Sequence, residues 1–238
     1  MQAFLAILHY DLAQLTHSWL VRIWVVLLVV PAFFLVAVAA NEKELASETM
    51  AAYIAAVLAP LSGLAVAILS AAAISGESGI VADSILSRSV TRTEYMAAKI
   101  ISRLGFTAAI YVAVTVPFAY LVTRYAAPDA TLGGVIAGLM MVGVLLVFLA
   151  ALGITMSTLL SNVLVAVLTV LVTVVVSGAA LQFLGLNWMS TTAVIDGLPE
   201  TFRGETATFD HIRVMLMFSM LTAASLGTAV FVFRRKDL

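Results

Sequence analysis

The chain has 238 residues, of which 63% are hydrophobic and 11% are charged, and its formal net charge is -1 at pH 7. Soluble domains contain about 45–50% apolar and about 25% charged residues, so this composition excludes an ordinary soluble domain and makes the lipid bilayer the expected solvent. The near-zero charge argues against a nucleic-acid partner, and the absence of cysteine excludes disulfides, thiolate catalysis and cysteine-bound metal.

Residues 1–20 are expected to form an amphipathic helix that lies in the membrane interface. In a helix, one narrow arc of its surface would be apolar and would carry Phe4, Leu8, Leu12, Leu15 and Trp19. Asp11 falls at the edge of the arc and disturbs the pattern. A frayed terminus is the alternative. We expect no cleaved signal peptide, because the stretch lacks a basic start and a small-residue cleavage site.

Six apolar runs are long enough to cross a membrane, since a crossing helix needs about 17–25 mostly apolar residues. They fall at residues 22–40, 51–75, 101–123, 132–156, 163–184 and 212–233. The fourth and fifth belong to one long run, 130–195, and the polar stretch "STLLSN" at 157–162 is the expected turn between them. The sequence therefore predicts an all-α integral membrane protein with one transmembrane domain over residues 1–238.

The distribution of basic residues predicts the orientation of the six helices. One side of the membrane would hold Arg22, Arg88, Arg92, Lys99, Arg103, Arg234, Arg235 and Lys236. The other side would hold only Lys43, Arg124, Arg203 and Arg213. Because short loops rich in Lys and Arg stay inside, both termini are expected to be cytoplasmic. A seventh span would place the basic end "RRKDL" outside.

The most polar part of the chain is the stretch 76–100, which is expected to be a cytoplasmic loop. Glycines can end the second span there, residues 80–86 have the apolar spacing of a short helix, and Thr93 and Glu94 begin the helix of the third span. Such a compact knob offers apolar and ionic contacts to a partner that docks from the cytoplasm. The alternative is a solvated loop that only sets the topology.

Sequence motifs for catalysis and for autonomous energy coupling are absent. The chain contains no H-E-x-x-H or G-x-S-x-G motif, and none of its lysines follows a glycine as in a phosphate-binding loop. The middles of the spans contain no Asp, Glu, Lys, Arg or His, which argues against a self-sufficient secondary transporter. We therefore expect no enzyme activity and no bound cofactor or metal, and any energy source must be a partner protein.

The loop 76–100 resembles a motif in the permease subunits of type-2 ABC transporters. That family carries a glutamate, a pattern close to G-T, a short gap, L-L-x-x-P-V-S-R and then a helix with a lysine. In this chain the matching positions are Glu77, Gly79, "IL" at 85–86, "SRSVTR" at 87–92 and Lys99. The end "FRRKDL" is similar to a basic signature followed by Asp-Leu in such subunits. Ser89 replaces a frequent proline, and Ile80 replaces the usual threonine.

The resemblance implies an exporter permease in a prokaryotic plasma membrane, in contact with lipids and paired with a second copy or a sister permease. It implies two separate ATP-binding subunits, which would use ATP and Mg and dock on the loop and on the turn near residues 157–162. The residues expected to couple to them are Glu77, Gly79, Asp83, Arg88, Arg92, Glu94 and Lys99. A haem-exporter-like or cofactor-maturation permease and a membrane scaffold without transport are the alternatives.

The segment 184–211 is the longest outer connection, and its first half is too apolar for a free loop. Residues 187–195 are expected to form one short helix that dips into the outer leaflet, a feature that the resemblance also implies. Trp188, Met189 and Ile195 would then form an outer gate. The alternative is a helix lying flat on the outer surface. Residues 196–210 are expected to be exposed and mobile.

Overall fold

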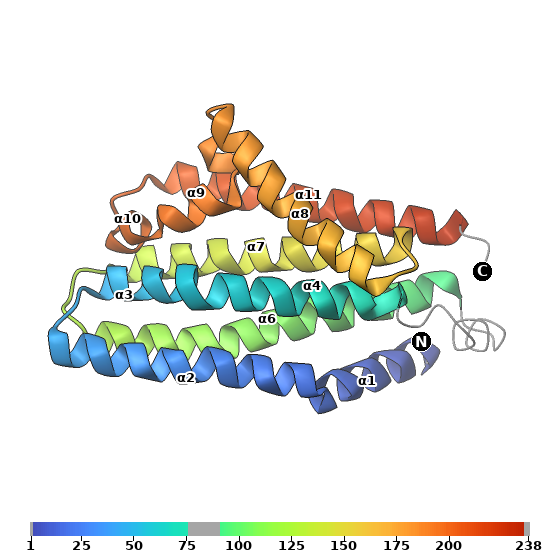
Figure 1. Ribbon diagram of the computed structural model, residues 1–238, viewed down its shortest axis with the longest axis horizontal. Coiled ribbons are helices and arrows are strands. Elements are labelled where there is room, and N and C mark those ends of the chain that lie inside the picture. Colours follow the sequence, from blue (N-terminus) through green and yellow to red (C-terminus); the bar gives the residue numbers. More distant parts are fainter. Residues whose placement is uncertain (1, 76–90, 236–238) are drawn as a thin grey trace.

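The computed structural model describes residues 2–75 and 91–235, and this part of the chain is all-α (Figure 1). In chain order the helices are α1 (Gln2–His17), α2 (Trp19–Glu42), α3 (Ala46–Tyr53), the π-helix η1 (Ile54–Leu58), α4 (Ala59–Ser75), α6 (Arg92–Tyr125), α7 (Leu132–Leu159), α8 (Val163–Phe183), the 3-10 helix η2 (Asn187–Met189), α9 (Thr191–Asp196), α10 (Leu198–Arg203) and α11 (Thr208–Arg235).

Six helices of the described chain have the length and apolar character of membrane crossings, which agrees with the number predicted from the sequence. They are α2, the continuous helix α3–η1–α4, α6, α7, α8 and α11. Together they indicate a multi-pass membrane protein. The third, α6, begins at Arg92, next to the helix start expected at Thr93 and Glu94, and its cap at Thr91 lies more than two turns before the apolar run.

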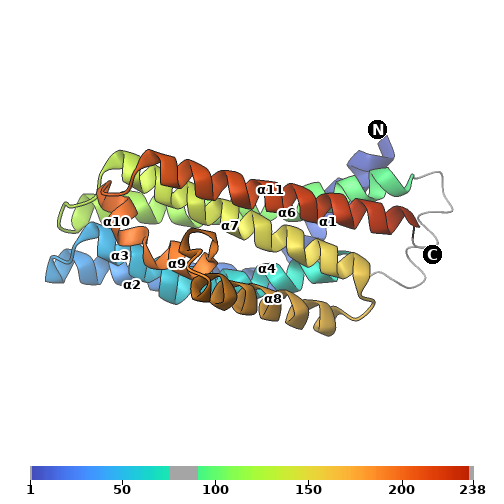
Figure 2. The same cartoon turned by 90° about the horizontal axis from the view of Figure 1, so that it is seen from above.

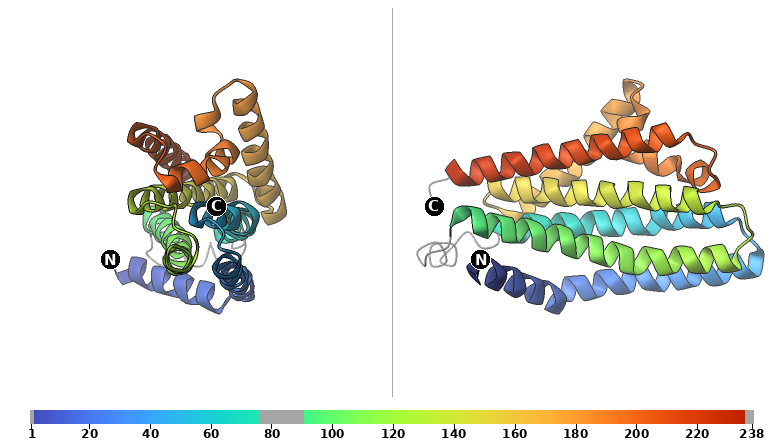
Figure 3. Two further views of the ribbon diagram at one scale, coloured as in Figure 1. Left: turned by 90° about the vertical axis from the view of Figure 1, so that its left-hand side faces the viewer. Right: turned by 180° about the vertical axis from the view of Figure 1, so that it is seen from behind.

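The long helices lie roughly along one axis, and the two ends of the chain lie at the same end of the bundle (Figure 1, Figure 3). We call this the terminus end; it carries α1, the last turns of α4, α7 and α11, and the first turns of α6 and α8. The opposite, far end carries the connection from α2 to α3, the connection from α6 to α7, and α10. An even number of crossings requires this arrangement of the termini.

Helix α7 is the centre of the bundle, because α4, α6, α8, α10 and α11 all pack against it (Figure 2). Two glycines allow the closest approaches. A Cβ atom on Gly153 would lie 2.6 Å from the Cβ of Ser70 on α4. A Cβ atom on Gly138 would lie 2.5 Å from Cε1 of Phe202 on α10. Both distances are shorter than packed side chains tolerate, so these neighbours require glycine.

The second crossing helix changes its winding near its middle. The π-helix η1 (Ile54–Leu58) interrupts it, and Pro60 follows in α4. Proline has no N–H for the helix ladder, and a π-turn is a common way for a helix to absorb such a defect. By contrast, α2 and α6 continue through Pro31 and Pro117 as α-helices.

Helix α8 leans away from the bundle, and the turn after it lies well short of the far end that α2 and α6 reach (Figure 1, Figure 3). The segment η2–α9–α10 then runs from this turn to the far end beside α7. Within α8 only Ala166, Val167, Val170 and Gly178 are buried. The far half of this crossing is thus completed by short helices rather than by α8 itself.

Candidate functional site at the terminus end

The predicted coupling residues fall into two groups. Glu77, Gly79, Asp83 and Arg88, together with the short helix expected at 80–86, lie outside the described residues. The remaining three, Arg92, Glu94 and Lys99, all lie in the first turns of α6. The described part of the proposed coupling region is therefore the start of one helix, and its neighbours show what that helix start is attached to.

A capping box fixes the beginning of α6. The Thr91 hydroxyl accepts a hydrogen bond from the Glu94 backbone N–H at 3.2 Å, and the Glu94 carboxylate accepts one from the Thr91 backbone N–H at 3.2 Å. The Thr91 hydroxyl also donates to the same carboxylate at 2.9 Å. These bonds satisfy N–H groups that a helix start leaves unpaired, an effect worth about 1 kcal/mol. Glu94 thus acts within the chain as a helix cap.

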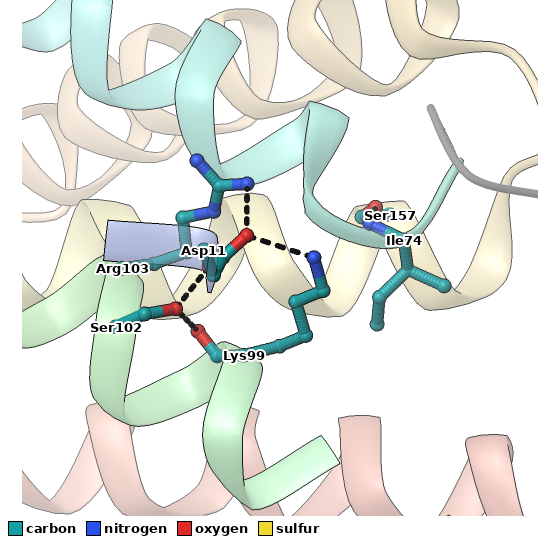
Figure 4. A network of polar contacts seen from close by, with 6 residues as sticks. All are labelled: Asp11, Ile74, Lys99, Ser102, Arg103 and Ser157. Carbon is teal, nitrogen blue, oxygen red and sulfur yellow. Dashed lines mark hydrogen bonds and ion pairs between the residues drawn. The ribbon is translucent and has the colours of Figure 1, made fainter. Parts of the chain in front are cut away.

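Two turns further along α6, a buried ionic cluster attaches this helix to α1 (Figure 4). Oδ1 of Asp11 lies 2.8 Å from Nζ of Lys99 and 3.1 Å from an Nη atom of Arg103. The hydroxyl of Ser102 donates to the other carboxylate oxygen. Residues at positions i, i+3 and i+4 share one helix face, so all three α6 side chains converge on the one carboxylate. The side chains of Asp11 and Lys99 are 0% and 2% exposed.

This cluster revises the interpretation of both partners. Asp11, which disturbed the apolar arc, is the residue that joins the N-terminal helix to the bundle. Lys99 faces Asp11 inside the same chain, so its ammonium group does not project toward the solvent. Separating one partner of a buried ion pair from the other costs about 3–5 kcal/mol. The attachment of α1 to α6 is therefore strong.

The start of α6 is also attached to the end of α11. The Arg92 guanidinium donates to the backbone carbonyl of Arg234 at 3.3 Å, and the Arg234 guanidinium donates to the hydroxyl of Thr93 at 3.2 Å. The rings of Tyr95 and Phe233 stack with their centroids 5.8 Å apart, and both are buried. Polar contacts at the rim and an aromatic contact beneath them hold the two helix ends together.

On the other side of residues 76–90, the last turn of α4 is attached to α7. The hydroxyl of Ser157 accepts hydrogen bonds from the backbone N–H groups of Ile74 and Ser75, each at 2.9 Å. Figure 4 shows Ser157 beside Ile74. All three residues are buried. Helix α7 ends at Leu159 and α8 begins at Val163, so the turn between them falls within the predicted stretch 157–162.

The end of α4 and the start of α6, which flank residues 76–90, are thus both anchored on other helices. We call this set of contacts the anchor frame: Asp11 with Lys99, Ser102 and Arg103, Arg92 and Thr93 with Arg234, Tyr95 with Phe233, and Ser157 with Ile74 and Ser75. Sequence reasoning missed Asp11, Ser102 and Arg103 as functional candidates, and it singled out Ser157 only as part of the turn 157–162. The available signal was a lone aspartate in an apolar arc and two cations spaced i, i+4.

Between the end of α8 and the far end, the predicted gate residues occupy two helical pieces rather than one. Trp188 and Met189 lie in η2, and Ile195 lies in α9. The expectation of a single helix over 187–195 is wrong because Ser190 interrupts it: this buried serine caps α9 by accepting from the Ala193 N–H. The Arg213 guanidinium lies 3.5 Å from the centre of the Trp188 ring, a cation–π contact that joins η2 to the start of α11.

The expectation that residues 196–210 are exposed is also wrong for α10. Leu198 and Phe202 are both 0% exposed, because the glycine at position 138 leaves room for the Phe202 ring against α7. Asp196, Glu200 and residues 208–210 are exposed, and so is most of the connection after α10. There the Glu205 carboxylate lies 3.0 Å from Nε of Arg203 and raises the pKa of that guanidinium.

Comparisons with known proteins do not assign a family to this chain. No protein-family model matches it, and no curated protein matches it. Within residues 2–75 and 91–235, no group of three or more His, Asp or Glu side chains could hold a metal ion. The observations support a helical protein with six candidate membrane-spanning helices.

Proposed function

We propose that the chain is the permease subunit of an ATP-driven ABC transporter of the type-2 class, and that it exports its substrate. Two copies, or one copy and a sister permease, form the pathway across a prokaryotic plasma membrane. The terminus end faces the cytoplasm, where two separate ATP-binding subunits dock and use ATP and Mg. The resemblance of residues 77–99 to the family motif is the sequence support for this proposal.

The anchor frame is the single observation that carries the proposal. Residues 76–90 connect α4 to α6, and each of these helices is bonded to further helices close to the connection. A partner that pushes on the connection therefore displaces α4 together with α7, and α6 together with α1 and α11. Interactions that cost several kcal/mol to break transmit such a force instead of yielding to it.

The predicted coupling residues divide into two roles under this proposal. Glu77, Gly79, Asp83 and Arg88 meet the ATP-binding subunit, with Arg92 at the edge of the same surface. Glu94 and Lys99 act inside the chain, as the cap of α6 and as the partner of Asp11. Trp188, Met189 and Ile195 lie on the short helices that run from α8 toward the far end, where substrate would leave.

Co-purification with an ATP-binding subunit tests the proposal. The chain is co-expressed with an ABC ATP-binding subunit, and the amount of this ATPase retained on the tagged permease in nanodiscs is measured. Reversing the two arginines of the loop, Arg88→Glu with Arg92→Glu, is expected to reduce retention at least several-fold. Arg124→Glu at the far end is the control, because it reverses an arginine away from the docking surface.

Two results would count against the proposal. If the wild-type chain retains no ATPase, the permease function is contradicted, and a scaffold that acts without one becomes the better explanation. If retention is equal in the double variant and in the Arg124→Glu control, the loop is not the docking surface. Circular dichroism of each variant confirms that its helices are intact.

A further inference from the structure

A groove opens on the face of the bundle between α6 and α11. The two helices touch at the terminus end, where Tyr95 stacks on Phe233, and they diverge toward the far end (Figure 3). Helix α7 forms the floor between them. The groove encloses about 480 Å³, and its walls and floor include Thr107, Tyr111, Gly143, Val147, Ser219 and Thr222.

The hydroxyl groups in this groove offer little to a polar ligand. Tyr111 donates its hydroxyl hydrogen to the carbonyl of Leu139 at 2.6 Å. Thr115 and Thr222 donate theirs to carbonyls one turn earlier in their own helices, each at 2.7 Å. Apart from Thr107 and Ser219, the rest of the lining is apolar. A molecule seated here would meet hydrocarbon, so its buried part must itself be apolar.

The dimensions of the groove exclude a helix as its occupant. The α7 residues that line it run from Ile136 to Val147, a length of about 16 Å at 1.5 Å per residue. Spread over that length, the volume corresponds to a cross-section of about 30 Å², whereas a helix about 10 Å across occupies about 80 Å². The space suits a single file of methylene groups.

The depth of the groove indicates the source of a hydrocarbon chain that would fill it. It begins one turn from the far-end start of α7 and reaches the middle of α6 and α11. Its length of about 16 Å is close to one leaflet of a hydrocarbon core about 30 Å thick. An acyl chain anchored at the far-end surface would therefore extend along the whole groove without bending.

We infer that this groove is a lipid site that holds one acyl chain of a phospholipid from the far-end leaflet. The acyl chain contacts α6, α7 and α11 at once, so the bound lipid exchanges more slowly than lipid on an open helix face. This site is separate from the anchor frame, and the inference depends on the membrane placement of the chain and not on its partners.

Photo-cross-linking in nanodiscs tests the site. The nanodiscs contain phosphatidylcholine with a diazirine in the middle of one acyl chain, and the adducts are mapped by mass spectrometry. Val112 and Met140 at the rim of the groove are 53% and 56% exposed, and Val172 and Val176 on the open face of α8 are 57% and 59% exposed. Equal exposure predicts equal labelling for bulk lipid, whereas a retained chain is expected to label the groove pair at least three-fold more.

A matched pair of substitutions locates the effect. Ser219→Phe places a ring in the groove from α11 and is expected to lower labelling of Val112 and Met140 to the level of the α8 pair. Ser177→Phe makes the same change at another exposed serine, on α8, and is expected to leave groove labelling unchanged. Labelling of Val172 and Val176 in the same samples shows whether each variant is correctly inserted.

A second probe, a free fatty acid carrying the same diazirine, tests whether the bound acyl chain belongs to a phospholipid. Preferential labelling of the groove by the phospholipid supports the inference. Labelling of the groove by the free fatty acid alone would overturn it and make the groove a site for a free apolar molecule. Equal labelling of the groove and α8 pairs by the phospholipid would also overturn it.

Discussion

Asp11 on α1 and Lys99 on α6 form an ion pair with 2.8 Å between Oδ1 and Nζ, and neither side chain is more than 2% exposed. The first two candidate crossings both lie between them in the sequence. They nevertheless meet about two turns into α6, close to the point where the chain leaves residues 76–90. The N-terminal helix is therefore part of the same mechanical unit as the start of α6. This unit is the basis of the proposed coupling.

Asp11→Asn is expected to destabilise the protein by about 3–5 kcal/mol, because the buried cationic groups of Lys99 and Arg103 would lose their shared carboxylate. Thermal unfolding in nanodiscs, followed by circular dichroism, measures the loss. Asp196→Asn is the control, since Asp196 is exposed at the far end, and it is expected to change stability by less than about 0.5 kcal/mol. An equal effect of the two variants would show that the Asp11 cluster is not a strong attachment.

A pair of glycines in α7 tests the central packing. Gly138→Ala would place a Cβ atom 2.5 Å from the Phe202 ring and is expected to cost about 1–3 kcal/mol through overpacking. Gly133 lies in the same helix, but a Cβ atom added there would meet no neighbouring atom within 4 Å. Gly133→Ala is therefore expected to be neutral or slightly stabilising through helix propensity. Unfolding temperatures of the two variants measure the difference. Similar temperatures would mean that α10 does not pack closely on α7.

The orientation of the bundle can be measured directly because the chain has no cysteine. Glu44 at the far end and Gln14 on α1 are both exposed, so each tolerates a cysteine probe. In intact cells a membrane-impermeant maleimide is expected to label Glu44→Cys at once, and Gln14→Cys only after the membrane is permeabilised. The reverse pattern would place the anchor frame outside the cell, where no ATP-binding subunit could dock.

The parts of the fold that depend on local sequence were predictable. Hydropathy located the six crossings because a bilayer demands about 20 apolar residues in each. Thr93 and Glu94 were expected to begin the helix of the third span, and α6 does begin there, at Arg92, after a capping box of Thr91 and Glu94. Both signals are contained within a single stretch of the chain, so no knowledge of the tertiary structure was needed.

The parts that depend on distant contacts were not predictable in this way. An aspartate in an apolar arc reads as an imperfection until Lys99 and Arg103 are placed beside it. The burial of Phe202 requires the space left by Gly138, which precedes it by many residues. Ser190 is an ordinary polar residue in the sequence, and only its burial and its cap on α9 show why the expected helix is divided.

The central claim is that ATP turnover in a partner moves the helices of this chain, and a distance measurement tests it most directly. Spin labels at Ile101→Cys on α6 and Leu168→Cys on α8 use exposed positions on separate helices near the terminus end. Pulsed electron paramagnetic resonance of the complex in nanodiscs compares the ATP-free state with the state trapped by ATP and vanadate. The account predicts that the distance between the labels shifts on trapping, and that the shift is reduced in the Arg88→Glu, Arg92→Glu double variant. An identical distance distribution in both states of the wild-type complex would contradict it.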